Sequence, residues 1–109
     1  MGATLTPPIR LISRLVQDDP EMADIVTEFV EAIPARIESL REAWREQSWD
    51  RLKTLAHQLK GAGGSYGYPD ITTLGAAMEQ GFKARQAQDF DRWIEELDAL
   101  MKAARAGLA

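Results

Sequence analysis

The stretch AHQLKGAGGSYGY, residues 56–68, holds the side chains of this sequence that are best suited to covalent chemistry. It contains His57, the only histidine among 109 residues, and Lys60 three positions later. An imidazole is a nitrogen nucleophile whose neutral form is available near neutral pH. On a helix, a lysine three positions away lies about one turn from it and can stabilise a negative charge formed there. The pair therefore predicts a nucleophilic nitrogen with a cation beside it.

The helical phase of this segment predicts that the imidazole is exposed. At about 100° per residue, one side of the helix carries the apolar residues, which are Leu52, Leu55, Ala56 and Leu59. His57 falls on the other side, together with Lys53, Lys60, Gly61 and Gly64. Glycine costs a helix about 1 kcal/mol relative to alanine, but it leaves space for another protein to approach. We predict that Gly61, Gly64 and Lys53 belong to a partner-binding surface around His57.

Each of these residues also has an ordinary structural explanation. An exposed histidine or lysine on a helix is commonly a solvated side chain without a further role, and glycines near a helix end can simply terminate the helix. The prediction of a site rests on their combination.

The composition excludes several other kinds of site. The chain has no cysteine, which removes disulfides, thiolate catalysis and cysteine-based metal sites. A single histidine excludes sites with two imidazoles, and the inward Glu-x-x-His pairs of a metal centre in a helical bundle are absent. We therefore expect no cofactor. With 13 basic against 17 acidic residues and no basic run, we expect no binding to nucleic acid.

The sequence also argues against a membrane-spanning helix and a signal peptide. No apolar stretch approaches the roughly 20 residues that a membrane-spanning helix requires, and the first residues lack the pattern of a signal peptide. We expect a cytoplasmic protein with no membrane partner.

The elements that must position these residues are all predicted to be helices. Apolar residues recur at spacings of three and four almost throughout, and no segment alternates as a half-buried strand does. After Pro7 and Pro8, a short helix that must pack on something larger carries Ile9, Ile12, Leu15 and Val16. Residues 19–21, Asp-Pro-Glu, then predict a helix start. The long apolar face that follows consists of Met22, Ile25, Phe29, Ile33, Ile37, Leu40 and Trp44.

Pro34 lies inside this long pattern. Proline removes one backbone hydrogen bond of a helix, here the one to the Val30 carbonyl, and bends it. Because the apolar stripe continues in phase on both sides, we predict a kink, with a break at Pro34 as the alternative.

Three more helices complete the pattern. Ser48 is predicted to cap a helix that ends in a turn within the glycine-rich residues 61–68, and Asp70 is predicted to cap the next. The expected core residues of the three helices are Leu52, Leu55, Ala56, Leu59 and Ala62; then Ile71, Leu74, Met78 and Phe82; then Phe90, Trp93, Ile94, Leu97, Leu100, Met101 and Ala104. Trp44 and Trp93 are expected in the core, and Trp49 at one end of it. We predict an all-α fold, an antiparallel up-and-down four-helix bundle with a short additional N-terminal helix, as a single domain over residues 1–109.

The sequence resembles the histidine-containing phosphotransfer (HPt) domains of multistep two-component signalling. The resemblance rests on the motif H-x-L-K-G, formed here by His57, Leu59, Lys60 and Gly61, on Gly67 ten positions after the histidine, and on Glu79. The stretch HQLKGAGGSYGY is also similar to the phosphotransfer domain of chemotaxis-type histidine kinases. More loosely, the resemblance covers most of the chain, because the family is a four-helix bundle with this hairpin at its centre.

The resemblance implies that His57 accepts a phosphoryl group on its distal ring nitrogen and later gives it up. Lys60 matches the family lysine that faces the phosphoryl oxygens. Glu79 matches a glutamate that in some members accepts a hydrogen bond from the other ring nitrogen. The implied partners are a response-regulator receiver domain, a histidine kinase, or both. The receiver supplies the magnesium and the acceptor aspartate, so this chain is expected to be a monomeric carrier and not an enzyme.

The spacing of residues along the chain supports a contact between Glu79 and His57 independently of the resemblance. If the turn centres near Gly67, His57 lies ten residues before it and Glu79 twelve after it. On antiparallel helices the two then lie level within about 3 Å. Gln80 is the neighbouring alternative, which the helical phase disfavours, and a solvated glutamate is the ordinary interpretation of Glu79.

The sequence leaves alternatives open for the residues that dock a partner and for the kind of protein to which the domain belongs. Candidates for apolar docking residues are Ile9, Ile12 and Leu15, although core packing explains each of them as well. The chain contains no glycine-rich nucleotide-binding boxes, so it cannot phosphorylate itself with ATP. The alternatives to a free-standing carrier are a phosphotransfer domain of a larger kinase and an interaction bundle in which His57 is incidental.

Overall fold

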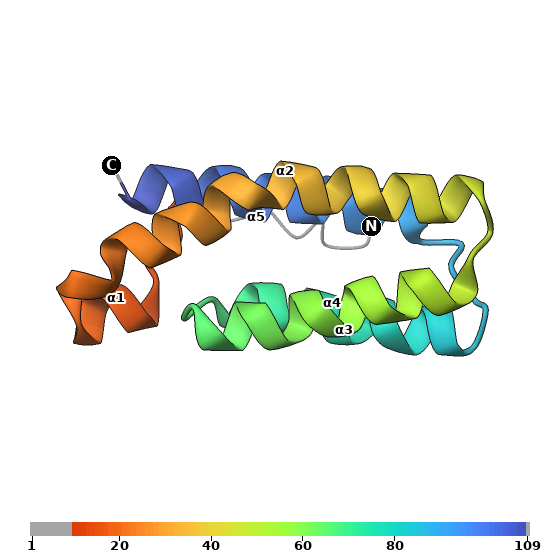
Figure 1. Ribbon diagram of the computed structural model, residues 1–109, viewed down its shortest axis with the longest axis horizontal. Coiled ribbons are helices and arrows are strands. Elements are labelled where there is room, and N and C mark those ends of the chain that lie inside the picture. The colour runs from red at the N-terminus through yellow and green to blue at the C-terminus, as the bar shows by residue number, and fades with distance from the viewer. Residues whose placement is uncertain (1–9, 109) are drawn as a thin grey trace, which may run out of the picture.

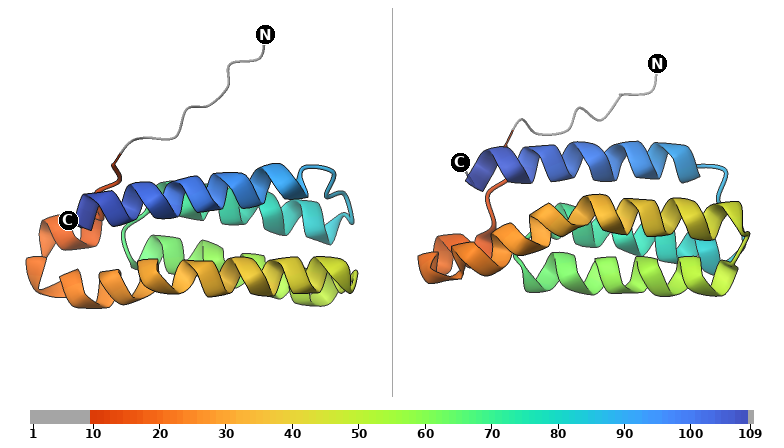
Figure 2. Two further views of the ribbon diagram at one scale, coloured as in Figure 1. Left: turned by 90° about the horizontal axis from the view of Figure 1, so that it is seen from above. Right: turned by 45° about the horizontal axis from the view of Figure 1, so that its top comes forward.

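The structure, a computed structural model, describes residues 10–108, in which every regular element is a helix and no strand occurs. The elements are α1 (Arg14–Asp18), a 3₁₀ turn η1 (Pro20–Met22), α2 (Ala23–Arg45), α3 (Trp49–Ser65), α4 (Pro69–Lys83) and α5 (Phe90–Leu108). Helices α2 to α5 run alternately up and down, with α2 and α5 on one side and α3 and α4 on the other (Figures 1 and 2). The short α1 lies across one end, beside the turn between α3 and α4. The predicted all-α bundle with a short N-terminal helix is confirmed.

The core lies between the four long helices. All the predicted core positions of α4 and α5 are buried, and in α3 the three most enclosed apolar side chains are those of Leu52, Ala56 and Leu59. Leu55 and Ala62 are half-buried and pack against this core from its edge. The periodicity of the sequence therefore identified the inner faces of these three helices.

Helix α2 continues through Pro34 as one helix of 23 residues, so the alternative of a break is wrong. Its ribbon bends in the half that leads from α1 (Figure 1). The predicted apolar face is only partly correct, because Ile25 is 46% exposed and Val26 and Val30 are buried in its place. Ile25 begins a row of apolar residues spaced four apart. Each step of four residues turns the side chain by about 40° around the helix axis, so Ile25, at the N-terminal end of the row, faces away from the core.

Two of the three predicted N-cap residues lie at the start of a helix, but only one of them makes the expected capping hydrogen bond. Asp19 does cap the first turn, where its carboxylate accepts a hydrogen bond from the Glu21 amide at 3.2 Å, although that turn is 3₁₀. Ser48 occupies the cap position of α3 but makes no side-chain capping bond. The prediction for Asp70 is wrong: Pro69 is the first residue of α4, and Asp70 lies inside the first turn. Proline suits this first position because its φ is already helical and its missing N–H is not needed there.

The N-terminal segment departs most from the sequence prediction. Pro7, Pro8 and Ile9 lie outside the described residues. The helix starts only at Arg14, so Ile12 precedes it and is 43% exposed. Leu15 and Val16 are half-buried against the core.

Hydrogen bonds anchor this segment on the turn between α3 and α4. The Ser13 hydroxyl donates to the Tyr66 carbonyl at 2.6 Å, and the Arg14 amide donates to the Gly67 carbonyl at 2.9 Å. Gly67 has a φ of +85°, in the left-handed region that favours glycine, and it turns the chain from α3 into α4. Helix α3 therefore ends inside the glycine-rich stretch, as predicted, but only after passing through Gly61, Gly63 and Gly64.

Large aromatic side chains fill the other end of the bundle. Trp44 stacks on Phe90 with ring centroids 4.4 Å apart, and Trp49 meets Trp44 edge-on at 6.0 Å. Trp93 packs edge-on against Phe82 at 5.6 Å. Trp93 is buried as predicted, whereas Trp44 is half-buried and packs against the core. We call this set of five residues the aromatic end.

Candidate functional site

His57 lies near the middle of α3 and points away from the core. Its side chain is 66% exposed, while Ala56, the residue before it, is completely buried. This contrast follows from the helical phase, because consecutive residues project about 100° apart. The imidazole is therefore available to a macromolecular partner.

Glu79 joins His57 and Lys60 from the neighbouring helix α4. One oxygen of its carboxylate, Oε2, lies 2.9 Å from His57 Nδ1, and the other, Oε1, accepts a hydrogen bond from Lys60 Nζ at 2.6 Å. Glu79 is only 5% exposed, so this bridge lies beneath the exposed imidazole. Gln80, the alternative considered from the sequence, is exposed and lies outside this group.

The surroundings of Glu79 keep it ionised. The hydrogen bond from Lys60 holds the pKa of its carboxyl below the ordinary value of 4.5, burial acts in the opposite direction, and the hydrogen bond from His57 adds to the effect of Lys60. An ionised carboxylate only accepts hydrogen bonds, so His57 Nδ1 must be the donor. In the neutral ring the proton is then on Nδ1, and Nε2 carries the lone pair, in a side chain that is 66% exposed.

The two predicted surface glycines are open in the structure. A Cβ added at Gly61 would meet nothing within 4 Å, and one at Gly64 would meet only the Thr72 hydroxyl, at 3.6 Å. Lys53 lies on the same helix but pairs with Asp50, at 3.9 Å between Nζ and Oδ1, and not with Glu79. Of the two lysines that flank the histidine, only Lys60 joins the bridge.

Reasoning from the sequence missed two glycines that bring α3 and α4 together. A Cβ at Gly63 would lie 2.7 Å from the Thr72 amide nitrogen, and one at Gly75 would lie 2.7 Å from the Lys60 amide nitrogen. The Thr72 hydroxyl also donates to the Lys60 carbonyl at 3.1 Å. Glycine inside an apolar helical face was a possible signal of close helix packing, but the sequence alone does not show which helix lies against it.

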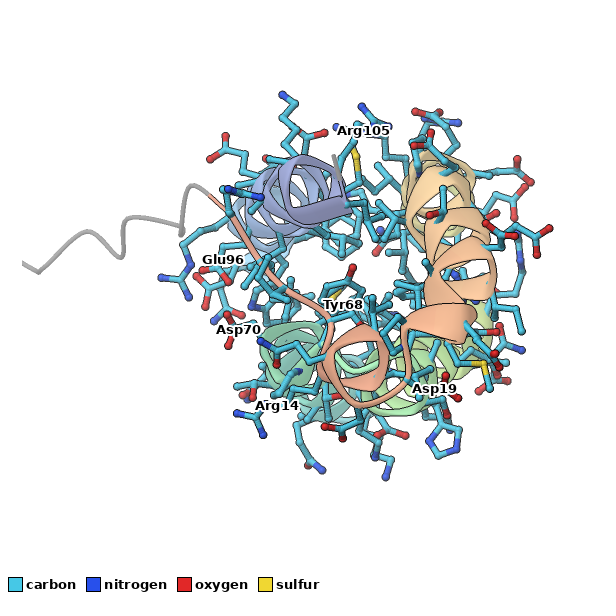
Figure 3. The ribbon with its side chains drawn as sticks, turned by 90° about the vertical axis from the view of Figure 1, so that its left-hand side faces the viewer. Arg14, Asp19, Tyr68, Asp70, Glu96 and Arg105 are labelled. Carbon is cyan, nitrogen blue, oxygen red and sulfur yellow. The ribbon has the colours of Figure 1, made fainter. Side chains whose placement is uncertain are left out.

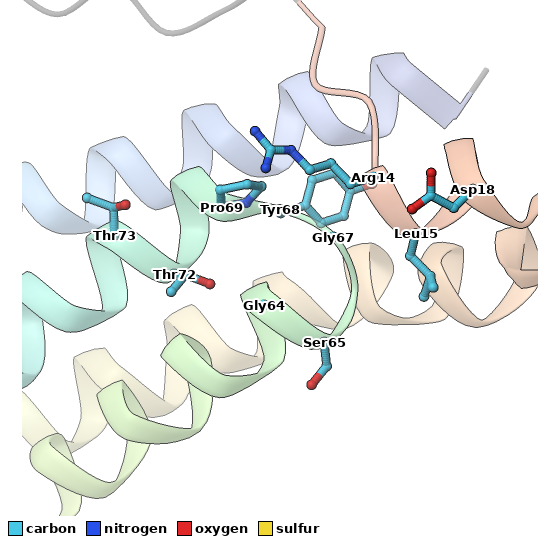
Figure 4. Close-up of a pocket in the computed structure, with 10 residues that line it drawn as sticks. All are labelled: Arg14, Leu15, Asp18, Gly64, Ser65, Gly67, Tyr68, Pro69, Thr72 and Thr73. Atoms are coloured by element: carbon cyan, nitrogen blue, oxygen red, sulfur yellow. The ribbon is translucent and has the colours of Figure 1, made fainter.

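A surface pocket of the molecule does not contain the bridge. It lies at the end of the bundle near α1 (Figure 4) and is lined by Arg14, Leu15, Asp18, Gly64, Ser65, Gly67, Tyr68, Pro69, Thr72 and Thr73. Of the predicted docking residues, Leu15 lines this pocket, Ile12 is exposed just before α1, and Ile9 lies outside the described residues. The exposed imidazole of His57 lies outside this pocket, on the outer face of α3.

Residues 10–108 contain no group of three or more histidine, aspartate or glutamate side chains placed to hold a metal ion. Within the same range, none of the helices has the length and apolar character of a membrane span.

Comparison with known proteins gives one match. A family model described as Hpt domain matches residues 24–107, which include α3, α4 and the whole His57–Glu79–Lys60 bridge. No curated protein and no solved structure matches the chain.

Proposed function

The chain belongs to the Hpt domain family, whose members transfer phosphoryl groups through histidine in phosphorelays, and on this premise we propose that His57 is the residue that carries the phosphoryl group. The observation that carries the proposal is the Glu79 carboxylate, which holds Nδ1 of an exposed imidazole at 2.9 Å and leaves Nε2 free. The proposed donors and acceptors are receiver domains of response regulators, histidine kinases, or both.

The transfer step exchanges one bond of phosphorus for another. The Nε2 lone pair of His57 attacks the phosphorus of an aspartyl phosphate, and the bond between phosphorus and the aspartate oxygen breaks as the P–N bond forms. The aspartate leaves as a carboxylate with the bonding electrons. Nδ1 keeps its proton, so the product ring is positively charged, and the Glu79 carboxylate stabilises it as the acid of a catalytic triad stabilises its histidine.

Lys60 offsets the negative charge that arrives with the phosphoryl group. Its ammonium is held 2.6 Å from Glu79 Oε1, about one helical turn from His57. Its side chain is 35% exposed, so it has room to turn toward an anion on Nε2. Stabilisation of this charge lowers the barrier without Lys60 forming a bond to phosphorus.

We infer that the chain is a carrier that depends on its partner for part of the chemistry. Magnesium and the acceptor aspartate belong to the receiver in this proposal. Gly61, Gly64 and Lys53 surround the imidazole on the open face of α3, where the partner would approach.

Radiolabel transfer tests the proposal. A phosphorylated receiver, or a kinase with labelled ATP, is expected to label the chain with acid-labile and base-stable phosphate. The variant His57→Gln is expected to lose all label while circular dichroism and thermal unfolding show that it remains folded.

Three outcomes of this experiment count against the proposal. Label that persists in folded His57→Gln would refute the assignment of His57. Label from ATP alone would show that the chain is a kinase in itself. No label from any receiver or kinase of a broad panel would favour an interaction bundle in which the histidine is incidental.

A further inference from the structure

The backbones of α3 and α4 touch at Gly75. A Cβ at this position would lie 2.7 Å from the amide nitrogen and 2.9 Å from the Cα of Lys60. Both are backbone atoms of a helix, which cannot yield as the tip of a flexible side chain can, and packed interiors do not absorb such an overlap. Any residue larger than glycine at position 75 must therefore push α3 and α4 apart.

This contact lies next to the carboxylate bridge. Gly75 and Glu79 are four positions apart on α4, so they lie one turn apart on the same face. The residue that Gly75 touches is Lys60, which itself binds Glu79. The separation of the two helices at Gly75 thus fixes how far the Glu79 side chain must reach.

We propose that Gly75 is a positioning residue: by lacking a Cβ, it sets the separation of α3 and α4 at which one Glu79 carboxylate reaches both His57 Nδ1 and Lys60 Nζ. Its effect on the imidazole is a property of the folded chain alone. Its effect on phosphoryl transfer rests on the function proposed above.

Another glycine of α4 provides a matched control. A Cβ at Gly81 would collide with the indole of Trp93 and lie 2.8 Å from the Gln86 carbonyl oxygen. Gly81 is therefore as crowded as Gly75 and lies on the same helix, but its neighbours are not in α3. An alanine at either position perturbs packing, and only the one at position 75 acts on the gap that Glu79 spans.

The tautomer of the imidazole is the direct readout. Because His57 is the only histidine, the ¹⁵N signals of histidine-labelled protein belong to it without ambiguity. In the unsubstituted chain the neutral ring is expected to be protonated on Nδ1. In Gly75→Ala the ratio of the Nδ1–H to the Nε2–H form is expected to fall several-fold, whereas Gly81→Ala lowers the unfolding temperature and leaves the ratio unchanged.

A double-substitution cycle separates an effect of Gly75 on the position of Glu79 from a general loss of packing between the helices. If Gly75 acts through Glu79, then adding Gly75→Ala to Glu79→Gln changes the tautomer ratio no further. A folded Gly75→Ala protein with the original ratio would overturn the proposal, and so would an equal fall of the ratio in Gly81→Ala.

A second variant keeps the inference testable if Gly75→Ala does not fold. Glu79→Asp leaves the backbone spacing alone and shortens the carboxylate arm by about 1.5 Å. It is expected to lose the Nδ1–H preference as Gly75→Ala does. An unchanged ratio in Glu79→Asp would show that the helix separation is not limiting and would overturn the proposal. Because these measurements use no phosphoryl donor, their failure is distinct from a failure of the proposed function.

Discussion

The interface of α3 with α4 and the aromatic end of the bundle are packed in opposite ways. At the aromatic end, large rings fill the space between helices, as in the stack of Trp44 on Phe90. Between α3 and α4, glycines at positions 63 and 75 let the backbones meet. Burial of an aromatic side chain removes about 150–250 Å² from water, at roughly 25 cal/mol per Å². A glycine has no side chain to bury and therefore contributes almost none of this stabilisation.

One region of this small bundle mainly supplies stability, and the other mainly sets the surroundings of the imidazole. The aromatic end supplies apolar burial, whose stabilising effect scales with the area removed from water. The α3–α4 interface buries less apolar side-chain area at its glycines. In return, the two helices lie close enough for the Glu79 carboxylate, which is 5% exposed, to contact polar groups of α3. Substitutions at the aromatic end should therefore lower stability and leave the imidazole tautomer unchanged, whereas those between α3 and α4 should change the tautomer as well.

The largest effect on stability is expected from Phe90→Ala. Phe90 is 3% exposed and stacks on Trp44, and removal of a buried phenylalanine costs about 3–5 kcal/mol of unfolding free energy. Urea unfolding measures this loss. At low urea, where the variant is still folded, the tautomer ratio of His57 is expected to be unchanged; a changed ratio would mean that the two regions are not separable.

The next effect in size concerns transfer rather than stability. Lys60→Ala is expected to slow phosphoryl transfer by roughly 10- to 100-fold, about 1.4–2.8 kcal/mol, without abolishing it, because in the proposed step the lysine stabilises charge and forms no bond to phosphorus. Lys102→Ala removes a lysine from α5 that pairs with Asp98 at 2.8 Å and serves as the control. Single-turnover transfer from a phosphorylated receiver distinguishes them, and equal rates would make Lys60 an ordinary surface charge.

A smaller effect is expected in the pH dependence of stability. The folded-state pKa of Glu79 lies below its ordinary value of 4.5, so the unfolded chain binds more protons at this site as pH falls. The stabilisation from Glu79 is then fully present above pH 4.5 and is lost as pH falls through the folded-state pKa. The difference in unfolding free energy between the original chain and Glu79→Gln should shrink over that window. A difference that is constant with pH would contradict an ionised, bridging carboxylate.

The smallest effect is expected at Tyr68, whose ring lies near the centre of the bundle in the end-on view (Figure 3). Its hydroxyl is buried without a hydrogen-bond partner among residues 10–108, and burial raises the pKa of this hydroxyl above its ordinary value of 10.0. Tyr68→Phe removes an unpaired polar group and should leave stability unchanged or raise it by up to about 1 kcal/mol. Thermal unfolding measures this change, and a clear loss would reveal a partner for the hydroxyl.

The sequence predicted features that depend on one helix better than features that depend on two. The exposure of His57 and the buried faces of α4 and α5 follow from helical phase alone, and the structure agrees. The placement of Glu79 beside His57 is the exception that joins two helices, and it was predictable because the short turn at Gly67 fixes the level of α4 against α3.

The features that were missed depend on how helices lie against each other. Ile25 was assigned to the core because the sequence does not show where a rotating stripe leaves the bundle axis. Gly75 was overlooked because a glycine carries no sign of the backbone that it contacts. Lys60 was predicted only as a partner for phosphoryl oxygens, and its bond to Glu79 depends on a helix separation that no residue spacing supplies.

The hairpin of α3 and α4 has a consequence for the order in which the molecule folds. His57 and Glu79 are 22 positions apart in the chain, whereas Glu31 and Arg105, which pair across α2 and α5, are 74 apart. Closing the shorter interval restricts the unfolded chain less, and contacts that are local in sequence form faster. We therefore expect the His57–Glu79 contact to form within a hairpin that assembles ahead of the docking of α5.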